Sequence, residues 1–135
     1  MPYNNRFKIP NTIWNLAKKQ ALASIVSYIN INRLITYSEL SEGISVLELG
    51  PHDQRLWDIC GDLSKESTKK YKFMISAWVV RTESQQPGGM YSEQGFTAWA
   101  KELGYKIDIN EDKFWYGQIL LIRKHYNLSN KKVVI

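Results

Sequence analysis

Residues 34–41 read Leu-Ile-Thr-Tyr-Ser-Glu-Leu-Ser, and this stretch carries the clearest structural signal in the chain. A short apolar run of strand type ends at Thr36, where a helix is expected to begin. Thr36 and Glu39 have the Thr-x-x-Glu spacing of a capping box, in which the hydroxyl and the carboxylate each accept a hydrogen bond from a free amide of the first turn. The sequence therefore predicts a short strand that leads directly into a capped helix.

The segments around this stretch predict two more helices. Asn11 is a suitable cap for a first helix of about two dozen residues at most, because apolar side chains recur there at helical spacing. The second helix begins at about Tyr37 and is expected to stop at Gly43. Asp53 is a good N-cap for a third helix, whose apolar face carries Leu56, Ile59, Cys60 and Leu63.

The C-terminal half predicts one well-defined strand. Residues 65–72 are polar and rich in lysine and are expected to form a connection. Residues 73–80 are apolar and rich in β-forming side chains, and their near-continuous hydrophobicity predicts a strand buried on both faces. Residues 82–90 are expected to form a loop, since they contain a Pro-Gly-Gly turn signal.

Two helices and a short strand are expected after that loop. Ser92 is a candidate cap for a helix that ends at Gly104, and residues 105–109 alternate as a short strand does. Asn110 or Asp112 then begins the last helix. At 135 residues the chain is expected to form a single α+β domain, with several helices around a small sheet, an extended arm at 1–10 and a tail at 127–135.

Charge is distributed unevenly along the chain. The net charge is +5, yet residues 39–112 hold all 13 acidic residues against eight basic ones, and both ends are purely basic. Basic ends attract nucleic acid or an acidic protein surface. Cys60 is the only cysteine, and we find neither a signal peptide nor an apolar run long enough to span a bilayer. These features predict a soluble cytoplasmic protein that does not interact with a membrane; the oligomeric state stays open.

The sequence offers little support for catalysis. His52 and His125 lie far apart, and one cysteine completes no recognisable metal-ligand set. Cys60 lies on the apolar face of its helix and is expected to be a core thiol, while Asp58 and Asp62 are expected to form a solvated acidic face. We therefore expect no metal, no cofactor and no enzymatic activity.

Four short motifs together resemble a known family. They are Ile-Thr-Tyr-Ser-Glu-Leu at 35–40, Gln-Arg-Leu-Trp at 54–57, Ile-Ser-Ala-Trp-Val-Val at 75–80 and Gly-Gly-Met-Tyr-Ser at 88–92. Over residues 34–104 the chain resembles the winged helix-turn-helix, DNA-binding domain of alkylguanine-DNA alkyltransferases and of their non-catalytic alkyltransferase-like relatives. It also resembles a set of small bacterial proteins without assigned function that share the first motif and the Val-Val strand.

The resemblance to alkyltransferases implies a DNA-binding site without the reaction. Tyr37 would help to rotate a nucleotide out of the duplex, and Arg55 would fill the vacated space, which offsets part of the cost of unstacking. The family's reactive Pro-Cys-His-Arg is replaced here, with Ser76 in place of the cysteine, Ala77 in place of the histidine and Trp78 after them. A serine without a base is no substitute for an activated thiolate, so we expect no alkyl transfer.

Two functions remain open from the sequence. The first is non-catalytic DNA binding, with Trp78 and Tyr91 as stacking surfaces and a set of lysines as phosphate contacts, namely Lys65, Lys69, Lys70 and Lys72. The second is protein interaction, as in an immunity protein or a phage or mobile-element inhibitor whose acidic middle covers a basic nuclease or toxin. The acidic third helix opposes the first hypothesis.

Structural alternatives exist for the three residues that matter most to the DNA hypothesis. Tyr37 is an aromatic residue at a helix start, a position that favours packing on the core. Arg55 is placed for a surface ion pair with Asp58 or Asp62, and Trp78 for packing inside a buried strand.

Overall fold

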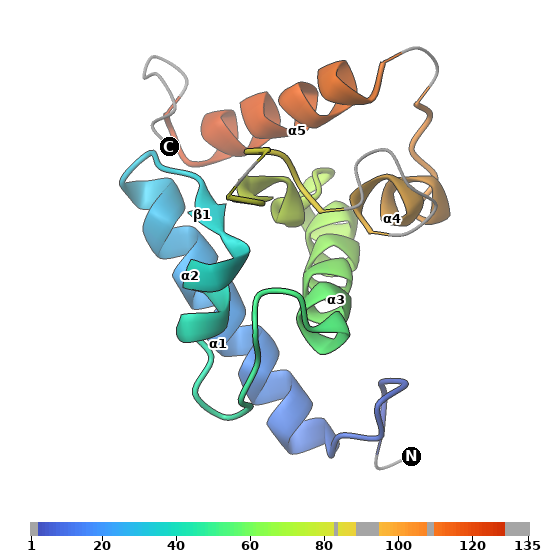
Figure 1. Cartoon of the computed structure of the whole chain (residues 1–135). Helices are drawn as coiled ribbons and strands as arrows, with labels where there is room; N and C mark the ends of the chain where they lie inside the picture. Colours follow the sequence, from blue (N-terminus) through green and yellow to red (C-terminus); the bar gives the residue numbers. More distant parts are fainter. Residues whose placement is uncertain (1–2, 83, 89–94, 108–109, 129–135) are drawn as a thin grey trace.

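The computed structural model describes residues 3–82, 84–88, 95–107 and 110–128 (Figure 1). The chain is a mixed helical domain with one small sheet, in agreement with the expected α+β class. Its elements in order are α1 (Asn11–Asn30), β1 (Ile35–Thr36), α2 (Tyr37–Glu42), α3 (Gln54–Tyr71), the 3₁₀ helix η1 (Ile75–Trp78), β2 (Val79–Val80), α4 (Phe96–Glu102) and α5 (Glu111–His125). Among the described residues, no helix has both the length and the apolar character needed to cross a membrane.

Helix α3 is the centre of the packing. It contacts α1 along one side, η1 at its C-terminal half and α4 near its middle, while α5 packs on η1 (Figure 1). The core between these elements is formed by large, fully buried side chains, among them Trp14, Ile25, Leu56, Ile59 and Trp78. Burial of this kind contributes about 1.5–3 kcal/mol for each large apolar side chain.

The capping box expected at the start of α2 is confirmed. The Thr36 hydroxyl accepts from the Glu39 amide at 3.2 Å, and the Glu39 carboxylate accepts from the Thr36 amide at 3.0 Å. The second carboxylate oxygen of Glu39 accepts from Arg33 at 2.9 Å and from the Tyr28 hydroxyl at 3.1 Å. This one side chain therefore joins the end of α1, strand β1 and the first turn of α2.

The sheet has two short parallel strands. Ile35 of β1 lies opposite Val79 of β2, and Thr36 lies opposite Val80. Ile35, Val79 and Val80 are all buried, so the start of α2 is fixed against the segment that follows η1.

The prediction of a strand over residues 73–80 is wrong for most of its length. Only Val79–Val80 is a strand, and Ile75–Trp78 forms a 3₁₀ helix. The segment is as buried as its hydrophobicity indicated, but polar side chains from other helices satisfy its backbone in place of a neighbouring strand. The Met74 amide donates to the side-chain oxygen of Gln118 at 2.8 Å. The amides of Ile75 and Ser76 donate to the hydroxyls of Ser67 and Ser64, at 2.9 and 3.0 Å.

The expected connection over residues 65–72 is also wrong, because α3 continues to Tyr71 and is capped by Lys72 in the left-handed conformation. The helix continues because Ser64 and Ser67 are buried against η1. Their hydroxyls accept hydrogen bonds from the amides of Ser76 and Ile75, respectively. Lysines near a helix C-terminus also interact favourably with the helix dipole.

The remaining boundaries differ slightly from expectation. Helix α1 begins at Asn11, but Pro10 occupies the cap position, so Asn11 is not the cap. Asn110 caps α5 as expected, since its side chain accepts from the amides of Asp112 and Lys113. Residues 105–107 form no strand; residues 108–109, Ser92 and residues 129–135 of the tail lie outside the described residues.

Candidate binding cleft

Tyr37 lies in the core, not on the surface. Its side chain is 4% exposed, its ring packs against Trp57 with centroids 6.3 Å apart, and its hydroxyl accepts from the Gly88 amide at 3.0 Å. Burial raises the pKa of the Tyr37 hydroxyl far above its ordinary value. In this structure Tyr37 fixes the loop before α4 against α2 and α3, so reaching a nucleotide would require that loop to move.

Arg55 is held at the start of α3. Its guanidinium donates to the Asp53 carboxylate, with Nη2–Oδ2 at 2.6 Å and Nε–Oδ1 at 3.0 Å, and to the carbonyl of Glu48 at 3.1 Å. These hydrogen bonds are the main reason that the pKa of Asp53 lies below its ordinary value. Arg55 therefore forms an ion pair, as the structural alternative predicted, but its partner is Asp53 and not Asp58 or Asp62.

Trp78 is fully buried, and its indole N–H donates to the carbonyl of Arg33 at 2.6 Å. It therefore presents no stacking surface in this structure, which fits the core alternative. Ser76, at the place of the alkyltransferase cysteine, is also buried and bonded to the Ser64 hydroxyl at 2.5 Å. Tyr91 lies outside the described residues.

The four predicted lysines lie on the C-terminal part of α3 and at its cap. All four are exposed, and Lys65, Lys69 and Lys72 follow the i, i+4, i+7 spacing of a single helix face. With 18 residues, α3 is about 27 Å long, so this lysine stripe is separated from Tyr37 and Arg55 near the other end. The structure does not gather the predicted residues into one site.

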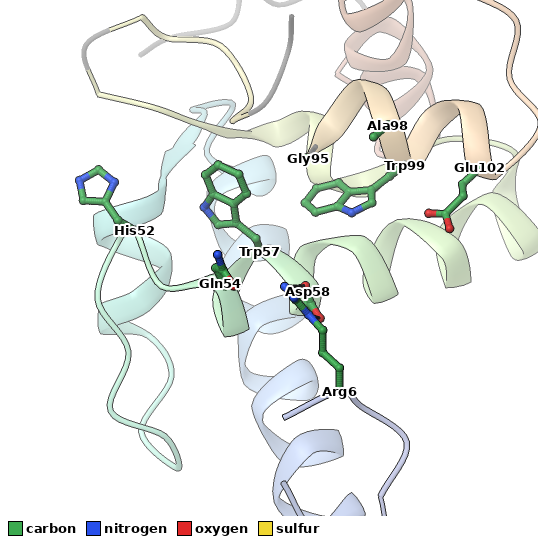
Figure 2. Close-up of a pocket in the computed structure, with 9 residues that line it drawn as sticks. All are labelled: Arg6, His52, Gln54, Trp57, Asp58, Gly95, Ala98, Trp99 and Glu102. Atoms are coloured by element: carbon green, nitrogen blue, oxygen red, sulfur yellow. Dashed lines mark hydrogen bonds and ion pairs between the residues drawn. The ribbon is translucent and has the colours of Figure 1, made fainter. Parts of the chain in front are cut away.

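A cleft does form near the N-terminal half of α3, where the N-terminal arm, α3 and α4 approach one another (Figure 2). We call it the tryptophan cleft. Its volume is about 480 Å³, and it is lined by Arg6, His52, Gln54, Trp57, Asp58, Gly95, Ala98, Trp99 and Glu102.

Two indoles form the aromatic walls of the tryptophan cleft. Trp57 comes from α3 and Trp99 from α4, and both are partly exposed (Figure 2). Trp99 packs over Gly61, where an added Cβ would lie only 3.0 Å from the indole ring. The indole nitrogen of Trp57 is buried and finds no hydrogen-bond acceptor among the described residues.

Two carboxylates, those of Asp58 and Glu102, line the cleft beside the indoles and give it negative charge. Asp58 accepts two hydrogen bonds from Arg6, at 2.8 and 3.0 Å. Glu102 is exposed and forms no ion pair within the part of the chain that the structure describes. Asp62, which accepts from the Trp14 indole at 2.9 Å, lines an adjoining hollow that shares Asp58, Trp99 and Glu102 with the cleft and also includes Lys65. Asp58 and Asp62 are thus partly engaged, in contrast to the solvated face expected from the sequence.

The groups of the tryptophan cleft favour noncovalent recognition of a cation. Indole faces attract ammonium and guanidinium groups, and carboxylates pair with them. The one thiol of the chain is not available, because Cys60 is buried in the core and burial raises its pKa to about 12. Within the described residues, no group of three or more histidine, cysteine or acidic side chains could hold a metal ion.

Sequence reasoning missed this cleft because its members come from three distant segments. The helical spacing of Trp99 favours a place in the core, and Arg6 is simply one of the basic residues of the N-terminal end. One signal was present: an isolated glycine inside a helix, such as Gly61, often marks the close approach of another element. Here the approaching element is α4, which places Trp99 against Gly61.

No protein-family model matches this chain, and no curated protein or solved structure is significantly similar to it. Its function has to be inferred from the fold and from the tryptophan cleft.

Proposed function

We propose that this protein is a non-catalytic binding module that docks a basic protein surface at the tryptophan cleft. One observation carries the proposal: two partly exposed indoles share a cleft with the carboxylates of Asp58 and Glu102. Tryptophan is enriched among the residues that dominate binding energy at protein interfaces. A lysine or arginine side chain over an indole face gains roughly 0.5–2 kcal/mol, depending on how fully it is desolvated.

The charge distribution supports a basic partner. Residues 39–112, which supply most of the cleft, hold 13 acidic residues against eight basic ones. Opposite charge steers association and raises the association rate, most strongly at low salt. A basic nuclease or toxin has the required surface. The chain would then act as an immunity protein or a phage inhibitor does, by covering that surface.

For the scaffold, we propose that residues 34–104 form a winged-helix unit of the alkyltransferase type. The order of a capped short helix, a longer helix and the buried Val79–Val80 strand supports this. The wing would follow Val80, where residues 83 and 89–94 lie outside the described part of the chain.

DNA binding is the second candidate, and the lysine stripe favours it. Lys65, Lys69 and Lys72 are exposed and form no ion pair with other described residues, so they are available to phosphates. The N-terminal half of α3, which would enter the major groove, carries Asp58 and Asp62 instead. That charge makes duplex DNA the weaker candidate.

The two candidates separate in one set of titrations. A labelled peptide of alternating lysine and arginine with glycine spacers, a short DNA duplex and single-stranded DNA are titrated with the protein over a range of salt concentrations. We expect the peptide to bind and Glu102→Gln to weaken its binding about fivefold. Glu42→Gln, the same change at an exposed glutamate of α2 outside the cleft, is the control and should have no effect.

Two results would overturn the proposal. One is DNA binding that Lys69→Gln weakens in the absence of any peptide binding. The other is peptide binding that Glu102→Gln and Glu42→Gln affect equally, since the cleft would then not be the site.

A further inference from the structure

The tryptophan cleft already holds one guanidinium, which belongs to the chain itself. Arg6 donates from Nε and Nη2 to the two oxygens of Asp58, at 2.8 and 3.0 Å (Figure 2). This is the bidentate geometry that a guanidinium forms with a carboxylate and that a lysine ammonium cannot form. The Arg6 side chain is 59% exposed, so it is held at the edge of the cleft.

The N-terminal arm is folded so that it presents Arg6 to Asp58. The Asn5 side chain accepts from the amides of Phe7 and Ile9, both at 3.1 Å, and donates to the carbonyl of Ile9 at 2.8 Å. Phe7 packs toward Trp14 of α1, with ring centroids 6.2 Å apart. The contact between Arg6 and Asp58 is therefore part of an ordered turn, and it shows that a guanidinium fits this edge of the cleft.

Arg6 leaves most of the cleft unused. Its guanidinium lies over the Phe7 ring, 4.7 Å from the centroid, and no cation lies over Trp57 or Trp99 within the described residues. Glu102, beside Trp99, forms no ion pair there either. A side chain entering from solvent thus meets two partly exposed indoles and the Glu102 carboxylate, which forms no ion pair with a described residue although Lys65 lines the adjoining hollow.

We infer that the group bound in the tryptophan cleft is a guanidinium, so that the partner inserts an arginine side chain that stacks on Trp99 and pairs with Glu102, its neighbour on α4 (Figure 2). This inference rests on the proposed function. A planar guanidinium stacks on an indole while it donates in its own plane to a carboxylate, whereas an ammonium has no flat face to stack. Arg6 opposes this entry, because it carries the same charge and occupies Asp58.

The test uses three labelled peptides with the same glycine spacers. Their remaining positions are all arginine in the first, all lysine in the second and all citrulline, the neutral isostere of arginine, in the third. We expect the arginine peptide to bind about tenfold more tightly than the lysine peptide, and the citrulline peptide to bind too weakly to measure. Arg6→Gln should strengthen binding of the arginine peptide, and Glu102→Gln should weaken it. Glu42→Gln is the matched control and should leave binding unchanged.

Failures of the two proposals give different results. Equal binding of the arginine and lysine peptides, weakened equally by Glu102→Gln, would overturn the arginine inference and leave the proposed function standing. If no cationic peptide binds at all, both are overturned. Weaker binding of the arginine peptide to Arg6→Gln would contradict the opposing role of Arg6. Arg6 and Glu102 are exposed, so we expect their variants to keep the melting temperature of the unmodified protein, which confirms that each result reports on the cleft.

Discussion

Glu39 is the residue on which the local structure depends most. Its carboxylate accepts from Thr36, Arg33 and Tyr28 and so joins three elements. Burial alone would raise the pKa of Glu39, but the hydrogen bonds from Thr36, Arg33 and Tyr28 outweigh it and hold the pKa below the ordinary value of 4.5. The ionised form is therefore the one that the fold stabilises.

This shift predicts a pH dependence of stability. A carboxylate whose pKa is lower in the folded state contributes fully above its unfolded-state pKa, here 4.5, and loses that contribution as the pH falls through the folded-state value. We expect the free energy of unfolding, measured with urea at several pH values, to fall below about pH 4.5 less steeply in Glu39→Gln than in the unmodified protein. Equal slopes would contradict the role given to Glu39.

Cys60 gives a second prediction at the residue scale. Because the thiol is buried and its pKa is raised to about 12, we expect no reaction with a thiol reagent at pH 8 in the folded protein and complete reaction in denaturant. Mass spectrometry after timed labelling measures both. Rapid modification of the folded protein would show that the core near α3 opens or that the thiol is reactive.

At the scale of elements, α3 performs two tasks along its length. Its N-terminal half supplies Trp57 and Asp58 to the tryptophan cleft, and its C-terminal half receives η1 through Ser64 and Ser67. Gly61 lies between these halves and admits Trp99 of α4. The position of Trp99, and with it one wall of the cleft, depends on this glycine.

The contact between Gly61 and Trp99 is testable by a double-mutant cycle. Alanine favours a helix over glycine by up to about 1 kcal/mol, so Gly61→Ala should stabilise the protein by that amount in a Trp99→Ala background. In the unmodified protein the added Cβ would lie 3.0 Å from Trp99, so we expect no gain or a loss. The free energies of unfolding measure the coupling, expected to exceed about 0.5 kcal/mol. The same change in both backgrounds would refute the contact.

Elements fixed by neighbouring residues were predictable from the sequence, and those fixed by distant ones were not. The capping box of Thr36 and Glu39 and the cap of α5 at Asn110 depend on side chains within three residues. The 3₁₀ turn of η1 instead depends on Ser64, Ser67 and Gln118, which are remote in the sequence. Hydrophobicity alone correctly indicated burial of this segment but incorrectly indicated a strand.

The candidate site was less predictable still. Tyr37 and Arg55 were selected by resemblance, and the structure places Tyr37 in the core and pairs Arg55 with Asp53. Trp57 and Trp99 line one cleft only because α4 packs on α3, and the single local signal of that packing is Gly61 inside α3. A cleft between distant segments becomes visible only once their packing is known.

At the scale of the whole molecule, opposite charges are separated along α3. The tryptophan cleft collects carboxylates near one half of the helix, and the lysine stripe lies along the other, with Lys65 in the hollow that adjoins the cleft. A net charge of +5 therefore does not describe the cleft. A basic protein and a nucleic acid would be expected to approach different parts of this surface, so mapping the contact distinguishes them.

Binding of a cation in the tryptophan cleft is tested most directly by an NMR titration that follows the indole and backbone N–H signals together. The Trp57 and Trp99 indole signals are assigned with Trp57→Phe and Trp99→Phe. The indoles of Trp78 and Trp115 serve as internal controls, because their N–H groups donate to backbone carbonyls away from the cleft.

A cationic peptide is expected to shift the indole signals of Trp57 and Trp99 and to leave the signals of Trp78 and Trp115 in place. A DNA duplex that shifts the amides of Lys65, Lys69 and Lys72, together with a peptide that moves neither cleft indole, would contradict this expectation.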